Sequence, residues 1–199
     1  MGIHGSIVAL KLKRNKLTHH LIHELEESTH FNSEEIKILY SRFKDLVKVH
    51  KHKASISIPD FKDSLGVSDL RLAECVFTAF DKDGDKTIDF VEFAHGMSVI
   101  SERATIEEKI RFIFDVFDPD RDGLVKTNEL KEIMLLICKE KLTYLPEEQM
   151  EVLVQTTCNK IDSENKGVIT FKQFEESVSD YPFLHSFTSL DIKKYLGTD

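Results

Sequence analysis

Oxygen-bearing side chains recur at a fixed spacing in residues 118–129, which read DPDRDGLVKTNE. A 12-residue loop wraps around Ca²⁺ by offering oxygen atoms at positions 1, 3, 5, 7, 9 and 12, with a glycine at position 6 where the chain turns sharply. This segment, named loop 3, has Gly123 at position 6, but Lys126 at position 9 has no acceptor atom to offer. The predicted ligands are Asp118, Asp120, Asp122, the backbone carbonyl of Leu124, and Glu129.

The same spacing occurs in residues 81–92, DKDGDKTIDFVE, named loop 2. Its position 6 is Lys86, although that position needs a left-handed backbone, which costs a residue with a Cβ about 1–2 kcal/mol. We expect the carboxylates of the loop to attract the cation strongly enough to offset this cost. The predicted ligands are Asp81, Asp83, Asp85, the backbone carbonyl of Thr87, Asp89 and Glu92. The sequence therefore predicts two Ca²⁺ ions, and the alternative for either loop is an acidic surface turn.

A third copy, loop 4 (residues 162–173, DSENKGVITFKQ), keeps the glycine at position 6 but loses ligands. Lys166 stands at position 5 and Gln173 replaces the glutamate at position 12. We expect the Lys166 ammonium to lie beside Asp162 and Glu164 and to hold the loop closed in place of an ion.

A fourth copy, loop 1 (residues 49–60), resembles the others only at its end, with Ile56 at position 8 and Asp60 at position 12. It lacks the ligands for Ca²⁺. Paired loops of this kind exchange a short β ladder through position 8. We therefore expect Ile56 to pair with Ile88, and Val125 with Ile169.

Helical patterns flank each loop. Asn32 with Glu35, and Thr105 with Glu108, have the spacing of capping boxes, and apolar residues follow at helical intervals. The segments FDKDGDKTIDFVEF (80–93) and EEKIRFIFDVFDPDRDG (107–123) resemble EF-hand calcium sensors of the group that contains calcineurin B, plant calcineurin B-like proteins and neuronal calcium sensors.

The predicted fold class is all-α, with two paired EF-hand lobes, four helix-loop-helix units of which two have degenerate loops, and short β ladders between paired loops. The predicted divisions are a basic leader (1–30), lobe 1 with loops 1 and 2 (31–101), lobe 2 with loops 3 and 4 (102–180), and an apolar tail (181–199). The tail is interpreted either as a plug in the groove of lobe 2 or as a plain capping helix.

The amino terminus, MGIHGS, fits a myristoylation signal with Gly2 as the acceptor. One acyl chain anchors a protein only marginally, and the basic residues Lys11, Lys13, Arg14 and Lys16 would supply a second membrane signal. The alternative is an amphipathic leader that docks on protein.

Composition excludes several other classes of function. The formal net charge of −8 argues against general nucleic-acid binding, and three cysteines on predicted helices are typical of reduced, buried thiols in the cytoplasm. We find no catalytic constellation and expect no enzyme.

The resemblance implies a regulatory sensor. When Ca²⁺ binds, Glu92 and Glu129 are expected to move the helices that follow them and to expose an apolar groove. That groove would accept an amphipathic helix of a target protein of phosphatase, kinase or exchanger type. A calcium buffer and a constitutive EF-hand subunit of a cytoskeletal or axonemal assembly are the alternatives.

Overall fold

Reciprocal capping side chains mark where two of the predicted helices begin. The computed structural model describes residues 16–48, 55–65, 68–141 and 145–178. The Asn32 Oδ1 accepts a hydrogen bond from the Glu35 amide at 3.0 Å, and the Asn32 amide donates to Glu35 Oε2 at 2.9 Å. Thr105 and Glu108 make the same reciprocal pair, at 3.2 and 2.7 Å. Both predicted capping boxes are confirmed.

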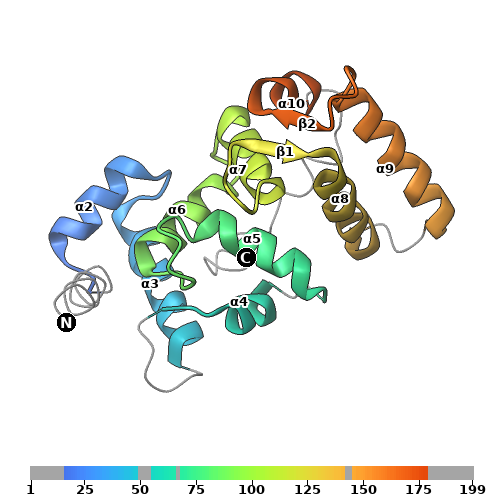
Figure 1. Ribbon diagram of the computed structural model, residues 1–199. Helices are drawn as coiled ribbons and strands as arrows, with labels where there is room; N and C mark the ends of the chain where they lie inside the picture. The colour runs from blue at the N-terminus through green and yellow to red at the C-terminus, as the bar shows by residue number, and fades with distance from the viewer. Residues whose placement is uncertain (1–15, 49–54, 66–67, 142–144, 179–199) are drawn as a thin grey trace, which may run out of the picture. The chain divides into compact units, whose positions relative to one another are not determined.

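The described part of the chain is mostly helical, with one small antiparallel sheet (Figure 1). The helices are α2 (His19–Ser28), α3 (Ser33–Lys48), α4 (Ile58–Leu65), α5 (Leu70–Phe80), α6 (Phe90–Val99), α7 (Ile106–Phe117), α8 (Thr127–Lys141), α9 (Glu147–Ile161) and α10 (Phe171–Val178), and the strands are β1 (Leu124–Lys126) and β2 (Val168–Thr170). Among the described helices, none combines the length and the apolar character that crossing a membrane requires.

The described residues divide into two compact units. Unit 1 contains residues 16–65 and 80–104, and unit 2 contains residues 68–79 and 105–178. Each unit buries its own aromatic cluster. In unit 1 the ring of Phe43 lies 5.5 Å from that of Phe90, and in unit 2 the ring of Phe114 lies 5.6 Å from that of Phe174. Offset and edge-to-face arrangements at such distances add to the free energy of apolar burial.

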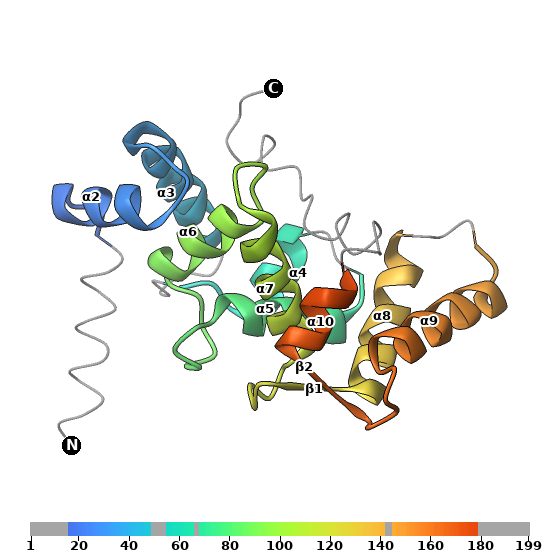
Figure 2. The ribbon, with the colours of Figure 1, turned by 90° about the horizontal axis from the view of Figure 1, so that it is seen from above.

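Short β pairings join the loops two by two, at the residues that the sequence predicts. Ile56 and Ile88 form an antiparallel bridge, with N–O distances of 2.9 and 3.0 Å. In unit 2, Val125 of β1 pairs with Ile169 of β2, and the two strands lie side by side in Figures 1 and 2. Together with the helices, these pairings confirm the all-α, paired EF-hand fold class.

Helix α2 occupies the second half of the segment that the sequence assigns to the leader. It packs on α3 and α6 in unit 1, and its Leu21 and Leu25 are buried. His95 of α6 approaches it as well, with its Nε2 3.1 Å from the hydroxyl of Ser28. Residues 19–28 are therefore part of the packed structure of unit 1.

Helix α5 leads into loop 2 but groups with unit 2 as far as residue 79. At its start, the backbone amide of Ser68 donates to Glu140 Oε1 of α8 at 2.7 Å. Near its end, the guanidinium of Arg121 in loop 3 donates to the Thr78 carbonyl at 2.6 Å. Hydrogen bonds within unit 2 thus tie both ends of α5 to the rest of that unit.

A close approach within unit 1 depends on Gly96 of α6. A Cβ at this position would overlap ring carbons of Phe80, the residue directly before loop 2. The Phe80 ring is buried and also packs edge-on against Phe61 of α4, with centroids 5.0 Å apart. Helices α4 and α6 therefore enclose this ring between them.

We expect Gly96→Ala to lower the free energy of unfolding by about 1–2 kcal/mol, although alanine is the better helix former. Urea unfolding in the presence of a chelator measures the change. In a Phe80→Leu background the same substitution should cost clearly less, because the leucine side chain can yield space. An equal cost in both backgrounds would contradict the expected clash.

Candidate calcium sites

Loops 2, 3 and 4 share one backbone geometry. Position 6 has a positive φ in each, at 65° for Lys86, 82° for Gly123 and 76° for Gly167. The left-handed conformation expected for Lys86 is therefore confirmed. Position 4 also has a positive φ in each loop, at 73° for Gly84, 58° for Arg121 and 53° for Asn165. The ligand spacing in the sequence does not reveal this second requirement.

The aspartate at position 1 produces this geometry by accepting backbone hydrogen bonds. In each loop one carboxylate oxygen takes the amide at position 5 and the other takes the amide at position 6. For Asp81 these N–O distances are 3.2 and 2.9 Å, for Asp118 they are 3.2 and 2.9 Å, and for Asp162 they are 2.8 and 2.9 Å. All three aspartates are buried. They are therefore structural residues whether or not their loop can hold a metal.

The side chain at position 12 accepts a hydrogen bond from the amide at position 9 in all four loops. The N–O distances are 3.3 Å for Ser57 to Asp60, 2.9 Å for Asp89 to Glu92, 3.4 Å for Lys126 to Glu129 and 3.0 Å for Thr170 to Gln173. Position 12 lies in the first turn of the helix that follows each loop, so this bond is the return half of a capping box. Asp60 and Gln173 accept this hydrogen bond as a glutamate does, so the ends of loops 1 and 4 keep the same capping contact without a glutamate at position 12.

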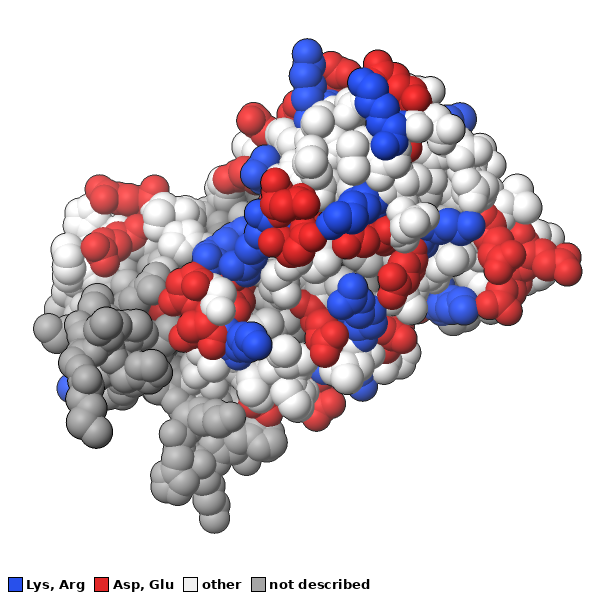
Figure 3. All heavy atoms as spheres, in the orientation of Figure 1, with Lys and Arg blue, Asp and Glu red and all other residues white. Residues whose placement is uncertain are grey.

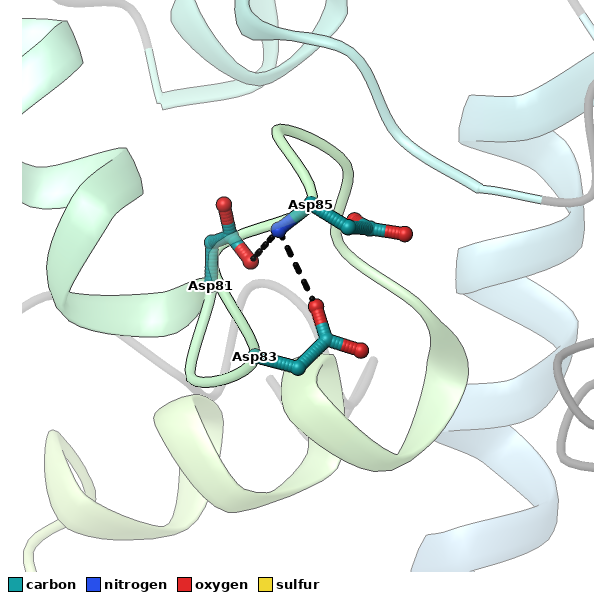
Figure 4. Close-up of side chains that lie close together, drawn as sticks. All are labelled: Asp81, Asp83 and Asp85. Carbon is teal, nitrogen blue, oxygen red and sulfur yellow. Dashed lines mark hydrogen bonds between the residues drawn. The ribbon is translucent and has the colours of Figure 1, made fainter. Parts of the chain in front are cut away.

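Loop 2 brings its first three aspartates together (Figure 4). One oxygen from each of Asp81, Asp83 and Asp85 lies within 4.8 Å of the others. Asp81 and Asp83 both point an oxygen at the backbone nitrogen of Asp85, each at 3.2 Å. Asp85 in turn accepts from the amide of Thr87 at 2.9 Å.

The last two predicted side-chain ligands of loop 2 are held at the start of α6. Asp89 is fully buried and its Oδ1 caps the helix by accepting the Glu92 amide at 2.9 Å. Glu92 is also buried, and its Oε1 accepts the amides of Lys82 and Asp83 at 3.1 and 3.3 Å. Burial raises the pKa of the Glu92 carboxyl, and the nearby Asp89 adds to this effect while the backbone hydrogen bonds oppose it.

Loop 3 gathers the same three positions, since one oxygen each of Asp118, Asp120 and Asp122 lies within 4.8 Å of the others. The amide of Leu124 donates to Asp122 Oδ1 at 2.8 Å, as Thr87 does to Asp85 in loop 2. Burial raises the pKa of the Asp118 carboxyl, and repulsion from its two acidic neighbours acts in the same direction.

Lys126 extends its side chain over the carboxylates of loop 3. Its Nζ lies 2.6 Å from Asp120 Oδ2, 3.7 Å from Asp122 Oδ2 and 3.5 Å from Glu129 Oε1. The hydrogen bond from this ammonium lowers the pKa of Asp120, and the same contact raises the pKa of Lys126. Sequence reasoning identified Lys126 only as a missing ligand, because the direction of its side chain is not visible in the spacing.

Loop 4 keeps the backbone geometry but not the ligands. Lys166 at position 5 forms an ion pair with Glu164, which confirms one contact that the sequence predicts. The Asp162 carboxylate accepts the hydroxyl of Thr127 at 2.8 Å in addition to its backbone partners. Burial acts to raise the pKa of Asp162, but these hydrogen bonds together outweigh it and lower that pKa. No carboxylate group of loop 4 joins a cluster of the kind found in loops 2 and 3 among the described residues.

Some of the predicted features fall outside the described residues. These features are Gly2, the basic residues of the leader up to position 14, the start of loop 1 and the tail (181–199).

The three cysteines are free and buried, as expected. On the face shown in Figure 3, acidic and basic side chains are interspersed and the described lysines and arginines form no continuous basic patch.

Comparisons with known proteins agree with this geometry. The EF-hand domain pair family matches residues 107–179. Bovine (Bos taurus) calcineurin B type 2 is 32% identical to the chain over 173 residues, which cover 87% of this chain and 94% of the relative. The chain belongs to the calcineurin B-like family of EF-hand proteins. Calcineurin B of Schizosaccharomyces pombe is 31% identical, covering 84% of this chain and 94% of that protein, and human calaxin is 30% identical, covering 78% and 77%.

The donor chemistry of loops 2 and 3 fits the ion that this family implies. Ca²⁺ is a hard cation that prefers carboxylate and carbonyl oxygens, and each loop presents a cluster of aspartate oxygens with no nitrogen or sulfur donor among them. This member of the calcineurin B-like family thus has two loops with clustered carboxylates, loops 2 and 3. Loop 4 shares only their backbone geometry.

Replacing Lys86 by glycine should relieve the strain at position 6 of loop 2. We expect Lys86→Gly to raise the free energy of unfolding in chelator by about 0.5–1 kcal/mol, since the left-handed penalty exceeds the extra flexibility of glycine in the unfolded chain. Urea unfolding measures this difference.

The matched control is Lys82→Gly, which removes an identical side chain from a position of the same loop where φ is not positive. Its free energy of unfolding should fall. If both glycine variants changed stability in the same direction, backbone strain at Lys86 would not be the cause.

Proposed function

We propose that this calcineurin B-like protein is a two-ion Ca²⁺ sensor that regulates a target protein. The observation that carries the proposal is the division among its loops, because two present clustered carboxylates and one retains the same backbone without them. Loop 4 closes through its own Asp162 and its Lys166–Glu164 pair, so loops 2 and 3 are left to respond to the ion. When bound, Ca²⁺ supplies the positive charge around which the carboxylates gather.

The residues that convert binding into movement are the glutamates at position 12. Glu92 and Glu129 lie in the first turns of α6 and α8, so any change in the partners of their carboxylates acts directly on the start of a helix. The Glu92 carboxylate accepts hydrogen bonds from three backbone amides. Exchanging these partners for Ca²⁺ alters the contacts between the start of loop 2 and α6. This is the physical basis on which a sensor differs from a buffer, in which the helices stay in place.

The relatives indicate what kind of target to seek. The calcineurin B proteins of Bos taurus and Schizosaccharomyces pombe are named as subunits, that is, as parts of a larger protein. Each of them matches this chain over most of its own length. We infer that the present chain likewise binds a partner, and that an amphipathic helix of a phosphatase, kinase or exchanger is the element it recognises.

Calcium titration tests the sensor directly. We expect the wild-type chain to bind two ions and to expose surface for a hydrophobic dye as it does so. Glu92→Gln and Glu129→Gln should each weaken one site by about 100-fold or more, because removing a direct ligand costs at least as much as removing an outer partner. Glu164→Gln in loop 4 is the control and should leave both sites unchanged. Two bound ions with no increase in dye binding would identify a buffer.

The lipid site at Gly2 is a separate proposal with its own measurement. Intact mass spectrometry of the protein expressed in a eukaryotic cell should show a myristoyl group on Gly2 and none on Gly2→Ala. The modified form should bind anionic vesicles and the variant should bind them more weakly, because the basic leader alone provides one of the two signals. An unmodified Gly2 in the natively expressed protein would refute the proposal.

A further inference from the structure

The most informative side chain outside the ligand set is Lys126, at position 9 of loop 3. Its ammonium is within 4 Å of Asp120, Asp122 and Glu129, three of the side chains that the sequence assigns to the metal, at 2.6, 3.7 and 3.5 Å. It lies at the end of β1, where the amide of the same residue also donates to Glu129 Oε2 at 3.4 Å. One residue thus contacts both the middle of the loop and its last ligand.

The equivalent position in loop 2 has the opposite charge. Asp89 is fully buried and its carboxylate caps α6, whereas the Lys126 side chain is 43% exposed and spans the acidic face of its loop. The two loops share a positive φ at positions 4 and 6 and the hydrogen bonds to the aspartate at position 1. The two loops therefore have a similar backbone but opposite side-chain charges at position 9, with Asp89 in loop 2 and Lys126 in loop 3.

An isolated surface ion pair contributes little to stability, because solvent screens it and two long side chains must be ordered. Lys126 differs from that case because one ammonium faces three carboxylates that repel one another. A divalent cation at the same oxygens would repel this ammonium across a few ångströms, so the two cations compete for the same carboxylates.

We propose that Lys126 is a tethered counter-cation of loop 3, which neutralises its ligands at low Ca²⁺ and must move aside for the ion to bind. The consequence is that loop 3 fills at a higher Ca²⁺ concentration than loop 2. This proposal rests on the proposed function, because it assumes that both loops bind Ca²⁺. It assigns to the Lys126 side chain a part of the difference in threshold that the added ligand Asp89 of loop 2 does not explain.

The test is a Ca²⁺ titration of the full chain followed by nuclear magnetic resonance, with one glycine amide as the reporter of each loop. The amides of Gly84 and Gly123 each donate to the position-1 aspartate of their own loop, both at 2.9 Å. In the wild type the Gly84 signal should shift at a lower Ca²⁺ concentration than the Gly123 signal.

Lys126→Gln should raise the affinity reported by Gly123 by about tenfold and leave that reported by Gly84 unchanged, since the substitution removes one positive charge from beside the site. Lys126→Met should raise it by a similar factor, which would show that the gain does not come from the oxygen that glutamine offers at position 9. Lys126→Arg retains the charge and should stay close to the wild type. Lys131→Gln is the matched control, because it removes one lysine charge from the helix that follows the loop, where Lys131 contacts Gln155 at 2.9 Å rather than the loop.

A second measurement, made in chelator, does not depend on the ion. Lys126→Gln should lower the urea midpoint of unit 2 because the three carboxylates lose their counter-charge, and this loss should shrink at high salt. Lys131→Gln should show neither effect. A lysine that acted only through packing would not produce a salt-dependent difference.

The outcomes separate this proposal from the proposed function. An unchanged Gly123 affinity in Lys126→Gln, with both loops of the wild type binding Ca²⁺, overturns the counter-cation and leaves the sensor intact. Binding at Gly123 only in Lys126→Gln supports the counter-cation and reduces the wild-type sensor to one ion. Absence of binding at Gly123 in every variant overturns both for loop 3.

Discussion

The structure of loops 2, 3 and 4 depends on one interaction, the pair of hydrogen bonds from the amides at positions 5 and 6 to the carboxylate at position 1. A buried carboxylate needs partners, and Asp81, Asp118 and Asp162 obtain them from their own loop. Accepting both amides bends the backbone through the left-handed region at positions 4 and 6. The bend places positions 3 and 5 beside position 1 and directs position 8 toward the partner loop.

The backbone bend depends on the position-1 aspartate and not on the other Ca²⁺ ligands. A hand can therefore lose those ligands and still keep the backbone of its loop. Loop 4 keeps Asp162 and Gly167, and so still presents Ile169 to Val125. Loop 1 contributes Ile56 to the bridge with Ile88 and closes its end through Asp60. Because paired loops share a ladder, each loop with clustered carboxylates is paired with one whose described residues form no such cluster. Losing ligands there costs little stability, whereas losing position 8 would remove the pairing itself.

The fold and the clustered aspartates could be predicted because their signals are local. Capping boxes, the spacing of loop ligands and the pairing at position 8 depend on motifs that each span about a dozen residues. The sequence could not show that Glu140 holds the start of α5, since those residues are distant in the chain. It also missed the left-handed Arg121, because non-glycine residues at position 4 carry no signature. Lys126 was visible only as a missing oxygen, since side-chain direction follows from packing.

The contact between Gly96 and Phe80 has a mechanical consequence for unit 1. Helix α6 touches the Phe80 ring at a point where even a methyl group would not fit, and the same ring meets Phe61 of α4. Close-packed interiors transmit displacement rather than absorb it. A turn of α6 about its own axis would therefore push the Phe80 ring and, through it, α4. The helix that ends the first hand is in this way coupled by packing to the helix that follows loop 2.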